Sequence, residues 1–262
     1  MKRFISWVGA LLLVVGMSTA NAATIRYYTP TDHSSEIATA ASNLAASLGG
    51  SSASSFTGFD DATWTTVLAS ANIIFIGQDA GTAALSATTR TNITSWVNAG
   101  GVLIVLWDSS NLDLVNNVMG ASMTWSYPDC CDSVPIPRTA AAAGSTYATA
   151  PATLPRLNDH GTIVTSSVPV SALSAYTLGA DTYAMSARVG AGSVSFLSWD
   201  WCCGDTPAER AAWDSALLSA ASFSGFAPAG PTEVPTLSEW SLFVLASLLA
   251  LGAIVTIRRR QF

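Results

Sequence analysis

Aspartates that follow apolar segments are the residues of this chain best placed to do chemistry. Three such segments are followed by Asp79, Asp108 and Asp200, and Asp32 follows an earlier one. In an open parallel sheet, ligands bind beyond the carboxyl ends of the strands. Carboxylates gathered there would shift one another's pKa values and bind a divalent cation through oxygen. The alternative is that each aspartate caps the helix that follows it.

A serine and two histidines raise the alternative of a secreted hydrolase. Ser109 is a candidate nucleophile, with His33 or His160 as its base. The chain has no Gly-x-Ser-x-Gly turn, which presents the nucleophile in α/β-hydrolases. His160 lies in a turn-like sequence, Asn158-Asp159-His160-Gly161. Ser109 and His33 therefore stay candidates, and no catalytic residue is assigned.

The four cysteines form two adjacent pairs, Cys130-Cys131 and Cys202-Cys203. Export favours disulfides, and bridges between the pairs avoid the strained ring of a vicinal disulfide. Closing a loop of roughly 70 residues would contribute about 4 kcal/mol. A zinc site is disfavoured, because adjacent cysteines lack the usual Cys-x₂₋₄-Cys spacing. Free or vicinal thiols are the other alternative.

Aromatic residues accompany the aspartates and the cysteines. Exposed tryptophan and tyrosine rings beside carboxylates are typical of surfaces that bind sugars, so a polysaccharide is one candidate partner. The alternative is that these rings pack beneath the segment that carries the first cysteine pair. The residues concerned are Trp107, Trp125, Tyr127, Trp199 and Trp201.

Apolar segments alternate with amphipathic ones from residue 24 to residue 119. This alternation predicts a parallel α/β sheet with right-handed crossovers. Residues 121–181 are expected to form an excursion with short strands, followed by a β-hairpin and a last helix. Strands are expected at 24–29, 54–57, 72–77, 102–107, 182–189 and 193–199, and helices at 34–48, 60–68, 86–98, 111–119 and 207–223.

The order of these elements resembles class I glutamine amidotransferase-like domains. The similarity lies in the order and spacing of strands and helices over about residues 23–225. The segments that carry it are Arg26–Pro30, Ile73–Gln78, Gly100-Gly101-Val102 and Gly192–Trp199. The resemblance implies a flavodoxin-like, mostly parallel sheet flanked by helices. That family carries its cysteine in a Gly-x-Cys-x-Gly turn, where this chain has Trp107-Asp108-Ser109-Ser110. Amidotransferase chemistry is therefore not expected.

Residues 1–22 are typical of a secretory signal peptide. Lys2 and Arg3 precede an apolar run, and Ala20-Asn21-Ala22 supplies a small-x-small cleavage pattern. An uncleaved membrane anchor is the alternative, but the run is shorter than the ~20 residues that a spanning helix needs. We expect export through the Sec machinery and cleavage after Ala22.

The C-terminal end combines a hydrophobic helix with a basic tail. Residues 240–257 contain no charge, and Arg258, Arg259 and Arg260 follow directly. The sequence predicts a single transmembrane helix over 240–257, with the arginines in the cytoplasm and the body of the protein outside. A buried helix of a soluble domain is the alternative, but it would show polar residues at helical spacing.

The eight residues Val234-Pro235-Thr236-Leu237-Ser238-Glu239-Trp240-Ser241 lead into this helix. Together with the helix and the arginines, they resemble the IPTL-CTERM sorting signal, whose pattern is Ile-Pro-Thr-Leu-x-x-Trp-Gly. Val234 stands in place of Ile, and Ser241 in place of Gly. The resemblance implies an exosortase-type membrane protease that cuts the tail. The protein would be anchored in the inner membrane with a periplasmic body, and would reach the cell surface or the surrounding matrix after processing.

The expected domain plan is a signal peptide over 1–22, an α/β domain over 23–226, a linker over 227–233 and a sorting signal over 234–262. The body from 23 to 231 has no lysine, and its six arginines against fifteen acidic residues give a net charge of −9. Such a body disfavours nucleic acid and other anionic partners. The sequence thus predicts an exported, non-catalytic module that binds a ligand or an envelope partner. A hydrolase and a purely structural envelope protein are the alternatives.

Overall fold

The first half of the domain alternates strands and helices as the sequence predicts. The structure is a computed structural model that describes residues 22–29, 34–78, 80–128, 134–155, 161–200 and 206–223. In chain order the elements are β1 (Thr24–Tyr28), α1 (Ser34–Ser47), β2 (Ser52–Phe56), α2 (Asp61–Ser70), β3 (Ile73–Ile76), the short 3₁₀-helix η1 (Thr82–Ala84), α3 (Ala87–Asn98), β4 (Val102–Leu106) and α4 (Ser109–Met119).

The second half begins with the expected excursion and ends with the expected hairpin and helix. The excursion contains one longer strand, β9, that was not predicted from the sequence. The elements are β5 (Trp125–Ser126), β6 (Ile136–Pro137), η2 (Ala141–Gly144), η3 (Thr146–Thr149), β7 (Thr153–Leu154), β8 (Thr162–Val164), η4 (Thr165–Ser167), β9 (Ala172–Leu178), β10 (Asp181–Val189), β11 (Gly192–Leu197) and α5 (Pro207–Ala221).

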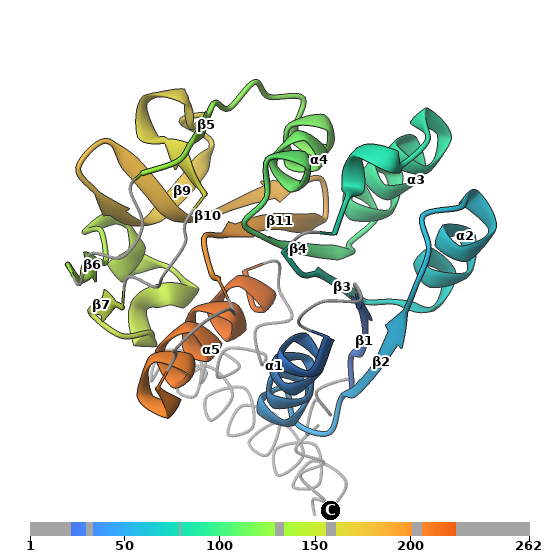
Figure 1. The fold of residues 1–262 in the computed structure, drawn as a ribbon, viewed down its shortest axis with the longest axis horizontal. Coiled ribbons are helices and arrows are strands. Elements are labelled where there is room, and N and C mark those ends of the chain that lie inside the picture. The colour runs from blue at the N-terminus through green and yellow to red at the C-terminus, as the bar shows by residue number, and fades with distance from the viewer. Residues whose placement is uncertain are drawn as a thin grey trace, which may run out of the picture.

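A mostly parallel sheet runs through the domain (Figure 1). Its strand order is β2-β1-β3-β4-β11-β10-β8-β5, with β9 also paired to β10. The pairs from β2 to β11 are parallel, and the pairs beyond β11 are antiparallel. The parallel part therefore has the 2-1-3-4-5 order of flavodoxin-like sheets. The fold is thus a mixed α/β fold, as the sequence predicts.

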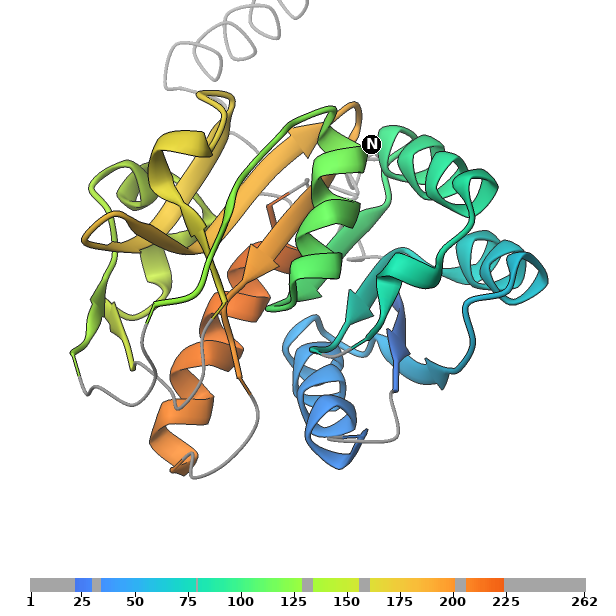
Figure 2. The same cartoon turned by 45° about the horizontal axis from the view of Figure 1, so that its top comes forward.

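Helices cover both faces of the sheet (Figures 1 and 2). Helices α1 and α5 pack on one face, and α2, α3 and α4 on the other. Every residue of β3 and β4 is buried, because these central strands are covered from both sides. The two faces are filled alternately: Phe75 and Ile104 point toward α1 and α5, whereas Ile74 and Leu103 point the other way.

The hairpin brings β11 to the centre of the sheet. β10 and β11 are antiparallel neighbours joined at a turn where Gly190 has a φ of 60°. A Cβ atom on Gly192 would overlap the Gly101 carbonyl oxygen, so this glycine lets the start of β11 lie against the start of β4. β11 then pairs with β4 from Ser193 to Leu197.

Arg138 connects parts of the excursion to one another, and Tyr147 connects the excursion to the sheet. The Arg138 Nη1 atom donates hydrogen bonds of 2.6–2.7 Å to the carbonyl oxygens of Tyr147, Ala148 and Ala150. The Tyr147 hydroxyl lies 2.8 Å from the hydroxyl of Ser186 on β10. Burial raises the pKa of Tyr147 well above its usual value, so this phenol stays protonated.

Several expected segments lie outside the described residues. They are the signal peptide over 1–22 except its last residue, the linker over 227–233 and the sorting signal over 234–262 with its helix at 240–257. Among the helices of the described ranges, none has the length and apolar character needed to cross a membrane.

Candidate functional site

The carboxyl edge of the parallel strands is where the chemistry-bearing residues were expected. Chain segments that leave β3, β4 and β11 carry Gln78, Asp108 and Asp200 at this edge. Ligands of open α/β sheets bind at such an edge. Its polar contacts therefore decide what the site can do.

Asp200 is buried at this edge and is hydrogen bonded to Gln78. The Gln78 Nε2 atom donates to the Asp200 carboxylate at 2.9 Å, and both side chains are only 1% exposed. Because β3 and β11 lie on either side of β4, this contact spans the end of β4. A buried carboxylate is stable only when it is hydrogen bonded or paired. Gln78 was not singled out from the sequence, although its position directly before Asp79 was a signal.

Asp108 caps the N-terminus of α4. Its Oδ1 atom accepts hydrogen bonds from the Ser110 backbone N–H at 2.6 Å, the Ser110 hydroxyl at 2.5 Å and the Asn111 backbone N–H at 3.4 Å. The backbone of Asp108 is extended, with a φ of 176°, so the turn lacks a left-handed residue. Ser109 is exposed as the first residue of the helix. The structure thus shows Asp108 in the capping role.

The Asn111 side chain connects the ends of β3 and β4 with the start of α4. This role was not predicted from the sequence. The Asn111 Nδ2 atom donates to the carbonyl oxygens of Gly77 and Leu106, each at 3.0 Å, and its Oδ1 atom accepts from the Thr82 hydroxyl at 3.0 Å. The side chain is fully buried. The signal for it was an asparagine at helical spacing with the buried residues Leu114 and Val115.

Two further acidic residues fix helix N-termini on the same side of the sheet. Asp60 caps α2 through the Thr63 side chain and backbone N–H, and these hydrogen bonds lower the pKa of Asp60. Asp61 accepts hydrogen bonds of 2.5 Å from the hydroxyls of Ser86 and Thr89 on α3. Both bonds lower the pKa of Asp61, so the carboxylate that links the two helices stays ionised.

Three aromatic residues form a partly exposed cluster, which we call the aromatic patch: Trp107, Trp125 and Tyr127. The Trp107 and Trp125 rings are stacked with centroids 6.3 Å apart, and the Trp107 and Tyr127 centroids are 6.5 Å apart. The Tyr127 side chain is 55% exposed. A Cβ atom on Gly161 would overlap the Trp125 ring, so the indole can occupy this position only because residue 161 has no side chain.

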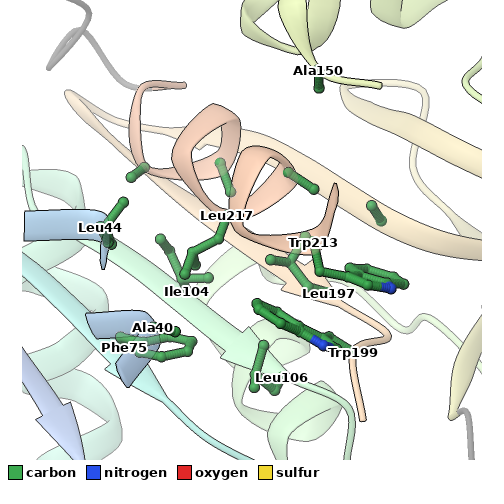
Figure 3. Packing of buried hydrophobic residues seen from close by; sticks show 14 of the residues in the cluster. Ala40, Leu44, Phe75, Ile104, Leu106, Ala150, Leu197, Trp199, Trp213 and Leu217 are labelled. Carbon is green, nitrogen blue, oxygen red and sulfur yellow. The ribbon is translucent and has the colours of Figure 1, made fainter. Parts of the chain in front are cut away.

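Trp199 does not belong to the aromatic patch. It is fully buried and stacks on Trp213 of α5, with ring centroids 5.9 Å apart (Figure 3). Of the two alternatives for these rings, exposed or packed, Trp199 is packed. The physical reason is its position after β11, where it faces the layer formed with α5.

A shallow pocket of about 270 Å³ lies between β7 and the start of α5. Its walls are mostly apolar, and Glu209 is the charged residue among them. Glu209 also takes part in the capping box of α5 with Thr206, which lowers its pKa. The lining residues are Pro135, Thr153, Leu154, Pro155, Ala208, Glu209 and Ala212.

Several candidate residues lie outside the described residues. They are Asp32, His33, Asp79, Cys130, Cys131, His160, Trp201, Cys202, Cys203 and the sorting-motif residues Val234, Pro235, Thr236, Leu237, Trp240, Arg258, Arg259 and Arg260. Within the part of the chain that the structure describes, no three His, Cys, Asp or Glu side chains come together as a metal site. The divalent cation expected from the sequence stays a prediction.

The C-terminal segment matches a known sorting motif. Residues 234–261 match the IPTL-CTERM motif. The motif implies an exported protein that is processed by an exosortase and sorted to the cell surface. A search of curated proteins found no match to the sequence.

The fold is similar to solved structures at low sequence identity. A putative ThuA-like protein from Parabacteroides merdae ATCC 43184 has a TM-score of 0.54 and 8% identity, covering 82% of this chain and 94% of that chain. A cytoplasmic protein from Salmonella typhimurium LT2 has a TM-score of 0.53 and 10% identity, covering 74% and 96%. A second Salmonella typhimurium cytoplasmic protein has a TM-score of 0.50 and 9% identity, covering 74% and 97%.

These similarities show the fold alone. The solved structures are ThuA-like and cytoplasmic proteins, not glutamine amidotransferases, although the fold class is similar. The resemblance to amidotransferases therefore holds only at the level of the fold class. The turn after β4, where that family has its cysteine, here carries the capping residue Asp108.

Proposed function

We propose that this chain is an exported, exosortase-processed surface or matrix protein whose α/β domain binds a ligand without catalysing a reaction. The IPTL-CTERM motif supports export and processing. The Sec machinery and an exosortase-type protease are the partners that this route requires. Nothing in the motif concerns the ligand, so the ligand is argued from the domain.

The proposal of a binding role rests on a difference between the aspartates and the aromatic rings at the carboxyl edge of the sheet. The carboxylates of Asp108 and Asp200 are engaged in a helix cap and a buried hydrogen bond. The rings of the aromatic patch, in contrast, are partly open to solvent. Both carboxylates thus take part in contacts that stabilise the fold. Exposed rings, however, offer a ready surface for binding.

A hydrolase that uses the strand-end aspartates would need a nucleophile and a base within hydrogen-bond reach. Ser109 is exposed, but the hydrogen bonds of Asp108 run to Ser110 and Asn111. Both histidines lie outside the described residues. The Asp108 carboxylate is thus engaged at the start of α4, and no base is assigned to Ser109.

A polysaccharide is the ligand class that the aromatic patch suits best. Sugar rings have apolar faces that pack on flat aromatic rings, and tyrosine adds a hydroxyl at the rim. The lysine-free body with its net charge of −9 disfavours anionic polymers. The proposed ligand is therefore a neutral polysaccharide of the envelope or matrix.

Native gel electrophoresis through soluble neutral polysaccharides tests this proposal. Dextran and xyloglucan serve as probes, and the tail-processed protein is compared with a Tyr127→Ala variant. We expect at least one probe to retard the wild-type protein, and Tyr127→Ala to weaken that binding about 5- to 10-fold. The matched control is Val170→Ala, which removes an exposed apolar side chain elsewhere. Equal retardation of Tyr127→Ala and wild type, or no retardation by either probe, would contradict the proposal.

A further inference from the structure

Strand β2 is an open end of the sheet (Figure 1). It pairs with β1 in unbroken register from Ser52 to Phe56, and no further strand of the described ranges pairs with it. An edge strand of this kind presents main-chain donors and acceptors to any strand that can lie beside it.

The ladder between β1 and β2 identifies the outward main-chain groups. The Ser52 N–H donates to the Ala23 carbonyl oxygen, and the Thr29 N–H donates to the Phe56 carbonyl oxygen. In a parallel ladder, alternate residues of one strand point toward the same neighbour. The main-chain groups of Ala53 and Ser55 therefore point away from β1.

One side chain reaches this edge. The Arg26 Nη2 atom lies 3.5 Å from the Ser55 carbonyl oxygen, which is the long limit of a hydrogen bond. The contact is therefore weak and easily exchanged for a shorter main-chain bond. The N–H and C=O groups of Ala53 have no such side-chain contact from the described residues.

The sheet is branched, and β9, which pairs with β10 off the main strand order, is irregular, with two register shifts. The two ends of the main strand order are protected very differently. β5, at the other end, has two residues and is followed closely by Pro128. β2 has five residues, with no proline, no charged side chain and no irregularity in its register. Proteins usually block an exposed edge with charge, proline, a bulge or a very short strand. Of these devices, β2 carries none.

Apart from the Arg26 guanidinium near Ser55, the chain around β2 carries few charges. Residues 37–59 and 62–78, which include most of α1, all of β2 and most of α2, contain no charged residue. Helices α1 and α2 flank β2 on opposite faces of the sheet. In a body with a net charge of −9, two copies meet with the least repulsion at such a surface. The exposed side chains on these helices are small, and include Ser42, Ala46, Ser47, Ala62, Thr65, Thr66, Ala69 and Ser70.

We propose that β2 pairs with β2 of a second copy of this chain, antiparallel and about a two-fold axis at Ser54. Ala53 of each copy then exchanges both main-chain hydrogen bonds with Ser55 of the other. The two Ser54 side chains face each other across the axis. A five-residue strand pair is smaller than a standard interface, so the small side chains of α1 and α2 add to the contact.

This inference goes beyond the proposed function and does not depend on it. The aromatic patch comes from β5 and the segments after β4 and β5, whereas the pairing surface is centred on β2 at the opposite end of the sheet order. A dimer would place two aromatic patches on one assembly. Two linked sites on one polymer bind more tightly than either site alone.

Cysteine cross-linking in the full-length chain tests the pairing. Ser54→Cys places two thiols across the proposed axis, and Thr88→Cys, at an exposed position on α3, is the matched control. We expect mild oxidation to convert Ser54→Cys to a covalent dimer at least about 5-fold more than Thr88→Cys or wild type. Equal cross-linking of the two variants would overturn the proposal. A cross-linked product with a mass other than twice the chain would also overturn it, since the edge would then bind another protein.

A charge at the same position gives a second measurement. Ser54→Lys places like charges opposite each other, so we expect the dimer fraction in sedimentation of the detergent-solubilised chain to fall at least 5-fold at equal concentration. Thr88→Lys adds the same charge away from the edge and is expected to leave the dimer fraction unchanged. A dimer that survives Ser54→Lys would use another surface and would overturn the proposal.

Discussion

At the scale of single residues, the carboxyl edge is organised by side chains that satisfy main-chain groups. Asn111 donates hydrogen bonds to the carbonyl oxygens of Gly77, directly after β3, and of Leu106, at the end of β4. Asp108 accepts hydrogen bonds from two N–H groups in the first turn of α4. Buried main-chain groups without a partner are costly, so these side chains stabilise the ends of β3, β4 and α4.

Replacing Asn111 with alanine is expected to destabilise the domain by about 2–3 kcal/mol. The reason is that the buried carbonyl oxygens of Gly77 and Leu106 each lose a donor. Denaturant unfolding followed by tryptophan fluorescence measures the change. Asn92→Ala, at an exposed position of α3, is the control, because it makes the same Asn-to-Ala change in helix propensity. A loss below 0.5 kcal/mol for Asn111→Ala would contradict the assigned role.

The residues of this edge were only partly predictable. The sequence allowed two roles for Asp108, a cap or a ligand, because an aspartate between a strand and a helix fits both. The structure shows the cap. The bonds of Asn111 and Gln78 could not be predicted, since their partners Gly77 and Asp200 lie 34 and 122 positions away.

At the scale of elements, helices α1 and α5 share one face of the sheet and are joined by a polar contact. The Asn43 Nδ2 atom of α1 donates to the Asp214 carboxylate of α5 at 2.9 Å. Burial raises the pKa of Asp214 above its usual value, and the Asn43 hydrogen bond and the charge of Arg210 offset this rise in part. The contact between the helices therefore holds a carboxylate that is costly to ionise.

Asp214→Asn is expected to stabilise the domain at neutral pH and to change how its stability depends on pH. A raised pKa in the folded state means that the folded protein binds the proton more tightly than the unfolded chain. The stability that Asp214 contributes is present at acidic pH and is lost as the pH rises through its folded-state pKa. The variant keeps an acceptor for Asn43, so we expect its Tm to exceed that of wild type by about 1–3 °C at pH 7.

Thermal melts at pH 7 and pH 3.5 measure this effect. The difference in Tm between Asp214→Asn and wild type is expected to shrink at the lower pH. Asp113→Asn, at an exposed position of α4, is the matched control. A variant less stable than wild type at pH 7 would show that the charge stabilises the α1–α5 contact.

The elements themselves were largely predictable up to residue 120. Capping residues such as Asp60 and Ser86, and the apolar segments of β3 and β4, carry local signals that need no tertiary information. Strand β9 was missed for a physical reason. Its pairing with β10 is interrupted by two register shifts, so its buried residues do not alternate regularly.

At the scale of the whole molecule, the flavodoxin-like order of the parallel strands was implied by the family resemblance and not by local patterns. Local patterns identify β4 and β11 as strands, but nothing in them shows that these two strands are neighbours. The glycine contact between Gly192 and Gly101 and the apolar match of Val194 and Phe196 with the α2–α4 face decide that pairing. Both are properties of the folded sheet.

The sorting signal predicts a defined change in mass. In a host with a working exosortase, mass spectrometry of the surface form is expected to show that residues 242–262 have been removed. Pro235→Ala, within the motif, is expected to retain the tail in most molecules. Ser238→Ala changes a position that the motif leaves open and is expected to be processed normally. A surface form of wild type that keeps the tail would contradict exosortase processing.

The four cysteines are expected to form disulfides between their two pairs. Thiol counting on unreduced, unfolded protein is expected to find no free thiol, and four after reduction. Four free thiols without reduction would contradict the prediction.

The central place of β11 has a consequence for how the protein reaches its folded state. Val102 of β4 pairs with Ser193, 91 positions further along the chain. A chain that crosses a membrane N-terminus first delivers β1 to β4 long before β11. Until then the edge of β4 is an uncharged, wholly apolar strand, a segment prone to aggregate. The domain can complete its sheet only when nearly all of it has emerged, so we expect β4 to be the segment most exposed to aggregation during that interval.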